Sequence, residues 1–247
     1  MQKQNLINRN LKVRLFEIFT SLEGEGILYG TKTLFVRLAG CPFSCFYCDT
    51  MPALPSDSGI EYDIEEARKL IDSKLEHNTY KVNFTGGEPL MQHKAVIELA
   101  KHIQLKQIPT YLESSCFDFS KFVQLIPYMN YIKIEFKTQD SQFVNQKNYV
   151  HILQNELMCL KTSIDKNKCP YIKILITSKT CKSEFTKLLR SIFNINGINN
   201  ISGFVLQPVH GTGKPKLEKL LKFYDLVYAY YKEVRIIPQL HKFMDVS

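Results

Sequence analysis

The hydrophobic pattern alternates between short apolar runs and longer segments that keep one apolar face. Runs rich in β-branched and aromatic residues predict strands at residues 13–19, 34–38, 81–84, 109–112, 130–136, 171–176, 203–206 and 233–236. Apolar residues spaced three and four apart predict helices at residues 63–75, 92–104, 149–160, 183–193 and 216–231. Such alternation is typical of a mainly parallel sheet with outer helices, so the pattern predicts an α/β fold in the form of an open or closed barrel.

The segments between these elements show no break in composition. The stretch 51–62 contains Pro52, Pro55 and Gly59, and polar residues dominate the stretch 138–147, so both are predicted to be loops. No low-complexity linker divides the chain, which predicts a single domain over residues 1–247. In α/β barrels, the loops after the carboxyl ends of the strands carry the functional residues, so motifs in those loops weigh most in the functional interpretation.

The composition narrows the class of protein. The 247 residues include 45% hydrophobic and 23% charged side chains, which excludes a disordered chain. No apolar run approaches the roughly 20 residues that a membrane helix needs, and the polar opening segment lacks the apolar core of a signal peptide. We therefore expect a cytoplasmic protein with no membrane partner. A formal net charge of +8 allows an anionic substrate, an acidic protein partner or a nucleic acid.

Three cysteines lie close together directly after the predicted strand 34–38. Cys41, Cys45 and Cys48 are separated by three and then two residues. Three thiolates on one tight loop can hold three irons of a cubane 4Fe–4S cluster and leave the fourth iron open to another ligand. A structural zinc site normally has four protein ligands, and here Asp49 is the neighbour that offers a fourth. A zinc-dependent nucleic-acid-binding module stays an alternative, although the basic residues are scattered and no base-reading motif is present.

Two motifs together resemble the signature of the radical S-adenosylmethionine (SAM) superfamily. The first is the cysteine triplet with an aromatic residue, Tyr47, directly before its last cysteine. The second is TGGEP at residues 85–89, after the predicted strand 81–84. The resemblance implies an incomplete TIM-type barrel, a 4Fe–4S cluster, and SAM bound at the open iron. Two adjacent glycines let backbone groups approach the amino-acid end of SAM closely, while Glu88 can shape the loop.

The flanks of these motifs resemble one family of the superfamily, the 7-carboxy-7-deazaguanine synthases. The similarity covers FTSLEGEG at residues 19–26, LFVRLAGC at 34–41, CDT at 48–50, QP at 207–208 and PQLHK at 238–242. It implies a lyase of queuosine and 7-deazapurine biosynthesis that contracts the ring of 6-carboxytetrahydropterin with Mg²⁺ and loss of ammonia. Activating enzymes of glycyl-radical proteins share the triplet and a similar length, so they stay a second alternative.

The resemblance also implies the residues of the site. The cluster ligands are Cys41, Cys45 and Cys48, and Thr50 binds Mg²⁺. The substrate is bound by Leu22, Glu23, Gly24, Glu25, Arg37, Thr85, His241 and Ser247, and SAM by Tyr47, Gly87, Glu88, Ser114, Glu135, Phe136, Lys137 and Gln207. Side-chain chemistry suits two of these roles, since a guanidinium such as Arg37 binds a carboxylate and Glu25 can accept from the N–H edge of a pterin. The chain departs from the family pattern at Glu23, at Glu135 and Phe136, and at Ser247.

Partners follow from charge and from the resemblance. The excess of positive charge predicts a basic face near the cluster that docks an acidic, flavodoxin-type reductant. The resemblance implies a homodimer that acts on a small molecule. We expect no nucleic-acid partner.

Overall fold

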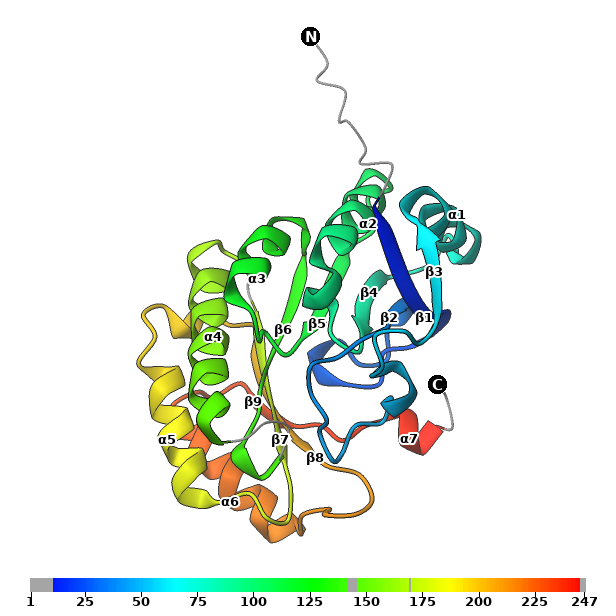
Figure 1. Ribbon diagram of the computed structural model, residues 1–247. Helices are drawn as coiled ribbons and strands as arrows, with labels where there is room; N and C mark the ends of the chain where they lie inside the picture. Colours follow the sequence, from blue (N-terminus) through cyan, green and yellow to red (C-terminus); the bar gives the residue numbers. More distant parts are fainter. Residues whose placement is uncertain (1–10, 142–145, 169, 245–247) are drawn as a thin grey trace.

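The computed structural model describes residues 11–141, 146–168 and 170–244, in which nine strands form one sheet (Figure 1). The strand order is β3-β1-β2-β4-β5-β6-β7-β8-β9. β1 is antiparallel to both of its neighbours, and every other pair is parallel. The edge strands β3 and β9 do not pair with each other, so the sheet is an incomplete barrel and the predicted fold class is confirmed. The strands are β1 Lys12–Leu22, β2 Lys32–Leu38, β3 Ile60–Asp63, β4 Lys81–Gly86, β5 Thr110–Ser114, β6 Tyr131–Phe136, β7 Tyr171–Ile176, β8 Gly203–Pro208 and β9 Val234–Ile236.

Helices cover the outer face of the sheet (Figure 1). In α5, Phe185, Leu188, Leu189 and Ile192 repeat at helical spacing and are all buried, while the polar residues between them are exposed or half-buried. No helix within the described residues is both long enough and apolar enough to cross a bilayer. The helices are α1 Ile64–Lys74, α2 His93–Leu105, α3 Phe119–Leu125, α4 Gln146–Asp165, α5 Lys182–Phe193, α6 Leu217–Tyr228 and α7 His241–Met244, with short 3-10 helices at Gly26–Leu28, Met51–Ala53, Pro89–Gln92, Ile126–Tyr128, Gln139–Ser141 and Ile198–Asn200.

The inner face of the sheet carries charged side chains within otherwise apolar strands. All six residues of β7 are buried. Ile172 and Ile174 pack into the hydrophobic core beneath the helices, and Lys173 between them lines the interior cavity. Because successive side chains of a strand point to opposite faces, the same alternation places Lys133 and Glu135 of β6 inside the barrel.

Several elements differ from the sequence-based prediction, and three of the differences are the most informative. The segment 51–62, predicted to be a loop, ends in the short strand β3, which pairs antiparallel with β1. Its sequence IEYD is mostly exposed and lacks a buried face, so the hydrophobic pattern does not reveal it. The helix α3 was not predicted, because its seven residues are too few for a clear helical period. The helix predicted at 149–160 is longer, at Gln146–Asp165.

Candidate functional site

A cavity of about 460 Å³ lies inside the incomplete barrel, at the carboxyl ends of its parallel strands. It brings together residues from all the predicted groups: Leu22, Glu23, Gly24, Glu25, Arg37, Cys41, Cys45, Tyr47, Cys48, Thr50, Thr85, Gly87, Glu88, Ser114, Glu135, Lys137, Gln207 and His241. The side chain of Phe136 lies elsewhere, in the hydrophobic core. Ser247 falls outside the described residues.

Several polar residues of the cavity wall had no assigned role in the sequence-based prediction, among them Lys133, Lys173 and Gln239. Lys133 and Lys173 lie on β6 and β7, and Gln239 lies in the C-terminal segment. A signal for the two lysines was present, because each interrupts a run of β-branched or aromatic residues in YIKIEF and YIKILI. A lysine in a strand that is buried on both faces needs a polar partner or a cavity.

The cysteine loop follows β2 and is held by backbone contacts. The backbone N–H of Cys41 donates to Leu54 O (3.0 Å), and that of Cys48 donates to Cys45 O (3.0 Å). Between them, Phe43 packs in a small apolar cluster that contacts Cys41 and Cys45. The loop therefore presents its thiols to the cavity from a fixed backbone.

The donor set of this loop fits an iron–sulfur cluster. Burial raises the pKa of all three thiols, that of Cys41 to about 12, and the Lys137 ammonium opposes this rise. Among the described residues, the ligand atoms that lie within 4.8 Å of one another belong to Glu25, Asp49 and His241. The three thiols are not in this group. Thiols that do not converge on one point suit a cubane cluster, in which each binds a different iron, better than a single tetrahedral zinc ion.

The turn after β4 packs against the start of the cysteine loop through its backbone. Gly87 N donates to Leu38 O (2.9 Å), and Glu88 N donates to Gly40 O (2.8 Å). A Cβ on Gly87 would lie 2.1 Å from Gly40 O, so only glycine allows this approach. The TGGEP motif is thereby fixed directly beside the cysteine loop.

The carboxylate of Glu88 holds the end of β4 against the end of β5. It is 1% exposed. Its Oε1 atom accepts from Leu90 N (2.9 Å) and Ser114 Oγ (2.7 Å), and its Oε2 atom accepts from Ser115 N (2.8 Å) and Ser115 Oγ (2.5 Å). Four donors satisfy this carboxylate, so its contribution to the site is to fix the shape of the wall.

Glu23, in the cavity wall, forms a buried ion pair with Lys81. Lys81 Nζ lies 3.0 Å from Glu23 Oε2, with side-chain exposures of 0% and 3%, and Asn83 Nδ2 donates to the same oxygen at 3.2 Å. Burial, reinforced by the Glu113 carboxylate, raises the pKa of Glu23 to about 7 although Lys81 opposes the rise. Glu23 is therefore expected to change its charge near neutral pH.

This pKa predicts a pH-dependent stability that the E23Q variant lacks. The pKa is about 7 in the folded state and 4.5 for a free carboxyl, so folding favours the protonated form. The resulting stabilisation is complete below pH 4.5 and is lost as the pH rises through 7. Between pH 5.5 and pH 8, the unfolding free energy of the native protein is expected to fall relative to that of E23Q by on the order of 2 kcal/mol. Chemical denaturation at both pH values measures it, and parallel pH dependence of the two proteins would contradict it.

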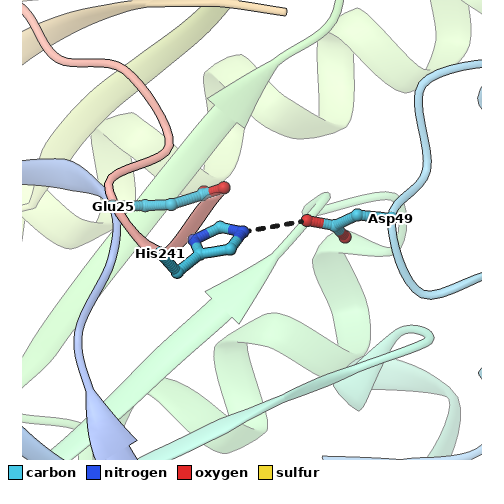
Figure 2. Close-up of side chains that lie close together, drawn as sticks. All are labelled: Glu25, Asp49 and His241. Carbon is cyan, nitrogen blue, oxygen red and sulfur yellow. Dashed lines mark ion pairs between the residues drawn. The ribbon is translucent and has the colours of Figure 1, made fainter. Parts of the chain in front are cut away.

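A second cluster of charges lies between the cysteine loop and the C-terminal segment. Figure 2 shows Glu25 and His241 facing Asp49, with His241 Nε2 at 3.6 Å from Asp49 Oδ2. Gln239 Nε2 donates to Glu25 Oε1 (2.8 Å) and to Asp49 Oδ2 (3.1 Å). One ligand atom from each of Glu25, Asp49 and His241 lies within 4.8 Å of the others, a grouping with oxygen and nitrogen donors that can hold a divalent cation.

Gly24 seats the C-terminal segment on the turn after β1. Leu240 N donates to Gly24 O at 2.9 Å. A Cβ on Gly24 would lie 2.5 Å from Nδ1 of His241, so the imidazole occupies the space that any other residue would fill. The C-terminal segment therefore lies beside the turn after β1, the first strand of the chain (Figure 1).

Arg37 and Thr50 connect this cluster to β2. Arg37 Nε donates to Glu17 Oε1 (2.7 Å), and its Nη1 donates to Thr50 Oγ1 (3.1 Å). Thr50 Oγ1 in turn donates to Asp49 Oδ1 at 3.1 Å. The guanidinium carbon also lies 5.4 Å from the ring centre of Phe19. These contacts orient the guanidinium at the cavity wall.

The Gln207 amide lines the cavity and lacks hydrogen-bond partners among the described residues. Its side chain is fully buried, and neither Nε2 nor Oε1 has a hydrogen-bond partner among the described residues. A buried amide without partners is costly, so a bound molecule with both donors and acceptors would satisfy it. The amino, carboxylate and ribose hydroxyl groups of SAM offer both, so the residues fit this cofactor.

Comparisons with known proteins agree with this arrangement. Residues 22–154 match the family model of the 4Fe-4S single cluster domain. The 7-carboxy-7-deazaguanine synthase of Archaeoglobus fulgidus is 32% identical over 249 aligned residues, which cover 96% of this chain and all of that protein. The crystal structure of QueE from Escherichia coli has a similar fold, with a TM-score of 0.66 at 18% identity, covering 94% of this chain and 96% of that one.

An incomplete barrel that presents a three-cysteine loop beside a Gly-Gly-Glu-Pro turn defines a radical SAM enzyme with a 4Fe–4S cluster. A domain of the pyruvate-formate lyase-activating enzyme from Bacteroides vulgatus shares this fold, at 16% identity and a TM-score of 0.51 over 63% of this chain and 98% of that one. By contrast, the sequence similarity to the synthase of Archaeoglobus fulgidus covers 96% of this chain. The chain belongs to the 7-carboxy-7-deazaguanine synthase family.

Proposed function

We propose that this protein converts 6-carboxytetrahydropterin into 7-carboxy-7-deazaguanine with release of ammonia, in queuosine and 7-deazapurine biosynthesis. The observation that carries the proposal is one cavity that joins the cysteine loop, the TGGEP turn and a wall of ionisable side chains. A reduced 4Fe–4S cluster held by Cys41, Cys45 and Cys48, with SAM bound, would supply a 5′-deoxyadenosyl radical. The protein's own residues bind the substrate, orient it and exclude water.

The charged residues of the wall suit a pterin carboxylate. Arg37 would bind the substrate carboxylate, since its guanidinium is already oriented at the cavity wall by Glu17 and Thr50. Glu25 would accept from the N–H edge of the ring, and Glu23 lies nearby in the same turn. His241 and the Thr85 hydroxyl would complete this half of the site.

A second group of cavity residues suits SAM. Gln207 offers an amide without partners among the described residues, Ser114 at the end of β5 donates to Glu88, and Gly87 is held by its N–H to Leu38 O. Lys137 carries a buried ammonium that is paired with Glu135 and lies 5.8 Å from the ring centre of Tyr47. We assign these residues to the cofactor.

Magnesium would bind where the substrate carboxylate and Thr50 meet. Mg²⁺ keeps several waters and takes few protein ligands, so one hydroxyl together with substrate oxygens suffices. Asp49 lies 3.1 Å from Thr50 Oγ1 and belongs to the cluster with Glu25 and His241, which can add carboxylate or imidazole donors.

One assay tests the proposal. The protein is reconstituted anaerobically with iron and sulfide, then given dithionite, SAM, Mg²⁺ and 6-carboxytetrahydropterin, and the products are read by mass spectrometry. Formation of 7-carboxy-7-deazaguanine, reduced when Mg²⁺ is omitted, supports the whole assignment. If only 5′-deoxyadenosine and methionine accumulate, the radical SAM chemistry stands and the proposed substrate is wrong.

Other features of the expected protein stay predictions. These are the flavodoxin-type reductant, the homodimer, the cytoplasmic location and the single domain over residues 1–247. The single domain is supported by the contacts of Gln239 and Leu240 with the turn after β1, because they make the C-terminal segment part of the cavity wall.

A further inference from the structure

Four charged side chains form a row of ion pairs across the cavity wall, in which Lys173, Glu135 and Lys137 are buried and Glu25 is half-buried. Lys173 Nζ lies 2.6 Å from Glu25 Oε2 and 3.0 Å from Glu135 Oε2. The other oxygen of Glu135 pairs with Lys137. The row therefore runs from the proposed substrate side at Glu25 to the proposed SAM side at Lys137.

Lys173 is the rigid member of this row. It lies in the middle of β7, directly opposite Glu135 of β6 in the parallel register. Its side chain is 4% exposed, and its neighbours Ile172 and Ile174 are packed in the core. A side chain that emerges from a fully buried strand has little freedom, so the position of its ammonium is determined by the sheet.

Glu25 is by contrast placed by distant contacts. It lies between β1 and a 3-10 helix, in extended backbone, and its side chain makes no capping hydrogen bond there. One carboxylate oxygen contacts Lys173, which is 148 residues away in sequence, and the other accepts from Gln239 at 2.8 Å. These two contacts hold the carboxylate from both sides.

We propose that Lys173 is a positioning residue for substrate recognition, which acts by holding the Glu25 carboxylate in place against the ring of the substrate. The inference rests on the proposed function and goes beyond it by adding a residue that need not touch the substrate. Without the ammonium, Glu25 and Glu135 would be two carboxylates facing each other in a largely buried setting. Glu25 would then turn away from Glu135, and it would no longer accept from the substrate in the same geometry.

The test is a double-mutant cycle between K173M and E25Q in the reconstituted holoenzyme, with native enzyme in parallel. K173M is expected to raise KM for 6-carboxytetrahydropterin about 30-fold or more, as truncation of a buried charge pair does. Substrate-free cleavage of SAM to 5′-deoxyadenosine and the cluster spectrum should change much less than KM, because Glu135 keeps Lys133 and Lys137 as partners when it loses Lys173. The K173M/E25Q double variant should have the KM of E25Q alone.

The matched control is K133M. Lys133 is also a buried lysine of the cavity wall and pairs with Glu135 at 3.5 Å, and its other carboxylate partner is Glu113 at 3.4 Å rather than Glu25. Its coupling to E25Q should be weaker than that of K173M, because Lys133 reaches Glu25 only through Glu135 and Lys173. K173R, which keeps the charge, should give a KM between those of the native enzyme and K173M. If K173M does not fold, the same cycle is run with K173R.

Several outcomes would overturn the inference. One is an unchanged KM in K173M, and another is an effect that adds fully to that of E25Q, which would mean that Lys173 acts independently. A native enzyme that makes no product refutes the proposed function instead. A crystal structure of substrate-free K173M tests the geometry separately, since the Glu25 carboxylate should leave Gln239, and a carboxylate that stays in place would contradict the inference.

Discussion

Replacing Cys45 with alanine is expected to abolish both the cluster and the reaction. Cys45 is one of three thiols on the loop after β2 that line the cavity, and its loss leaves two ligands for a cubane that needs three. Since the radical source would be missing, turnover should fall to background, by about 10⁶-fold or more. Iron content, the visible spectrum and the yield of 5′-deoxyadenosine measure the two effects separately.

The control for this variant is Cys181→Ala. Cys181 is an exposed thiol before α5 that does not line the cavity, so its loss should leave iron content and turnover unchanged. A Cys45→Ala protein that still assembles a full cluster and turns over would contradict the ligand assignment. Stoichiometric zinc and no iron in the native protein, purified anaerobically, would instead support the zinc-module alternative.

The second large effect is expected for Glu88→Gln. The carboxylate accepts hydrogen bonds from two backbone N–H groups, those of Leu90 and Ser115, one on each oxygen. Either orientation of an amide places an NH₂ group against one of these donors, which leaves a buried N–H without an acceptor. The expected cost is about 2–4 kcal/mol of unfolding free energy. KM for SAM should also rise about 10-fold or more, because Gly87 and Ser114 lose their fixed positions.

Glu98→Gln is the matched control for Glu88→Gln. Glu98 on α2 pairs with Arg68 (3.1 Å) and Lys101 (2.7 Å), and its side chain is 23% exposed. Ion pairs in such partly exposed settings contribute little, so we expect a loss of about 1 kcal/mol or less and no change in KM for SAM. Urea denaturation and steady-state kinetics give both quantities. Equal stability losses in the two variants would show that the burial of Glu88 has no special effect.

The local motifs of the site could be predicted from sequence alone because their chemistry depends on neighbours in the chain. The spacing of Cys41, Cys45 and Cys48 places three thiols on one loop whatever the rest of the fold does. The two glycines of TGGEP lie directly against the backbone of the preceding strand and loop, since a Cβ on Gly86 would lie 2.3 Å from Leu38 N and a Cβ on Gly87 would lie 2.1 Å from Gly40 O. The alternation of strand and helix patterns likewise follows burial directly, and it predicted all the strands of the parallel part of the sheet, β2 and β4 to β9.

Features that depend on contacts between distant segments were decided by the tertiary structure. The strand β3 exists because it pairs with β1, since its own sequence has no buried face. Phe136 follows Glu135 directly, yet the pleat of β6 sends its side chain into the core and that of Glu135 into the cavity. Strand alternation is visible in sequence, but which face lines a cavity depends on how the sheet curves.

The placement of Glu25 shows the same division most clearly. In the sequence it lies in a glycine-flanked acidic turn, which without the family resemblance would be interpreted as an ordinary solvated turn. The sheet brings Lys173 to one oxygen of its carboxylate, and the C-terminal segment brings Gln239 to the other. Sequence thus determined which chemistry the chain carries, because ligand spacing and glycine requirements are local. The tertiary structure determined which charges meet, because buried ion pairs form between residues that only the completed fold makes neighbours.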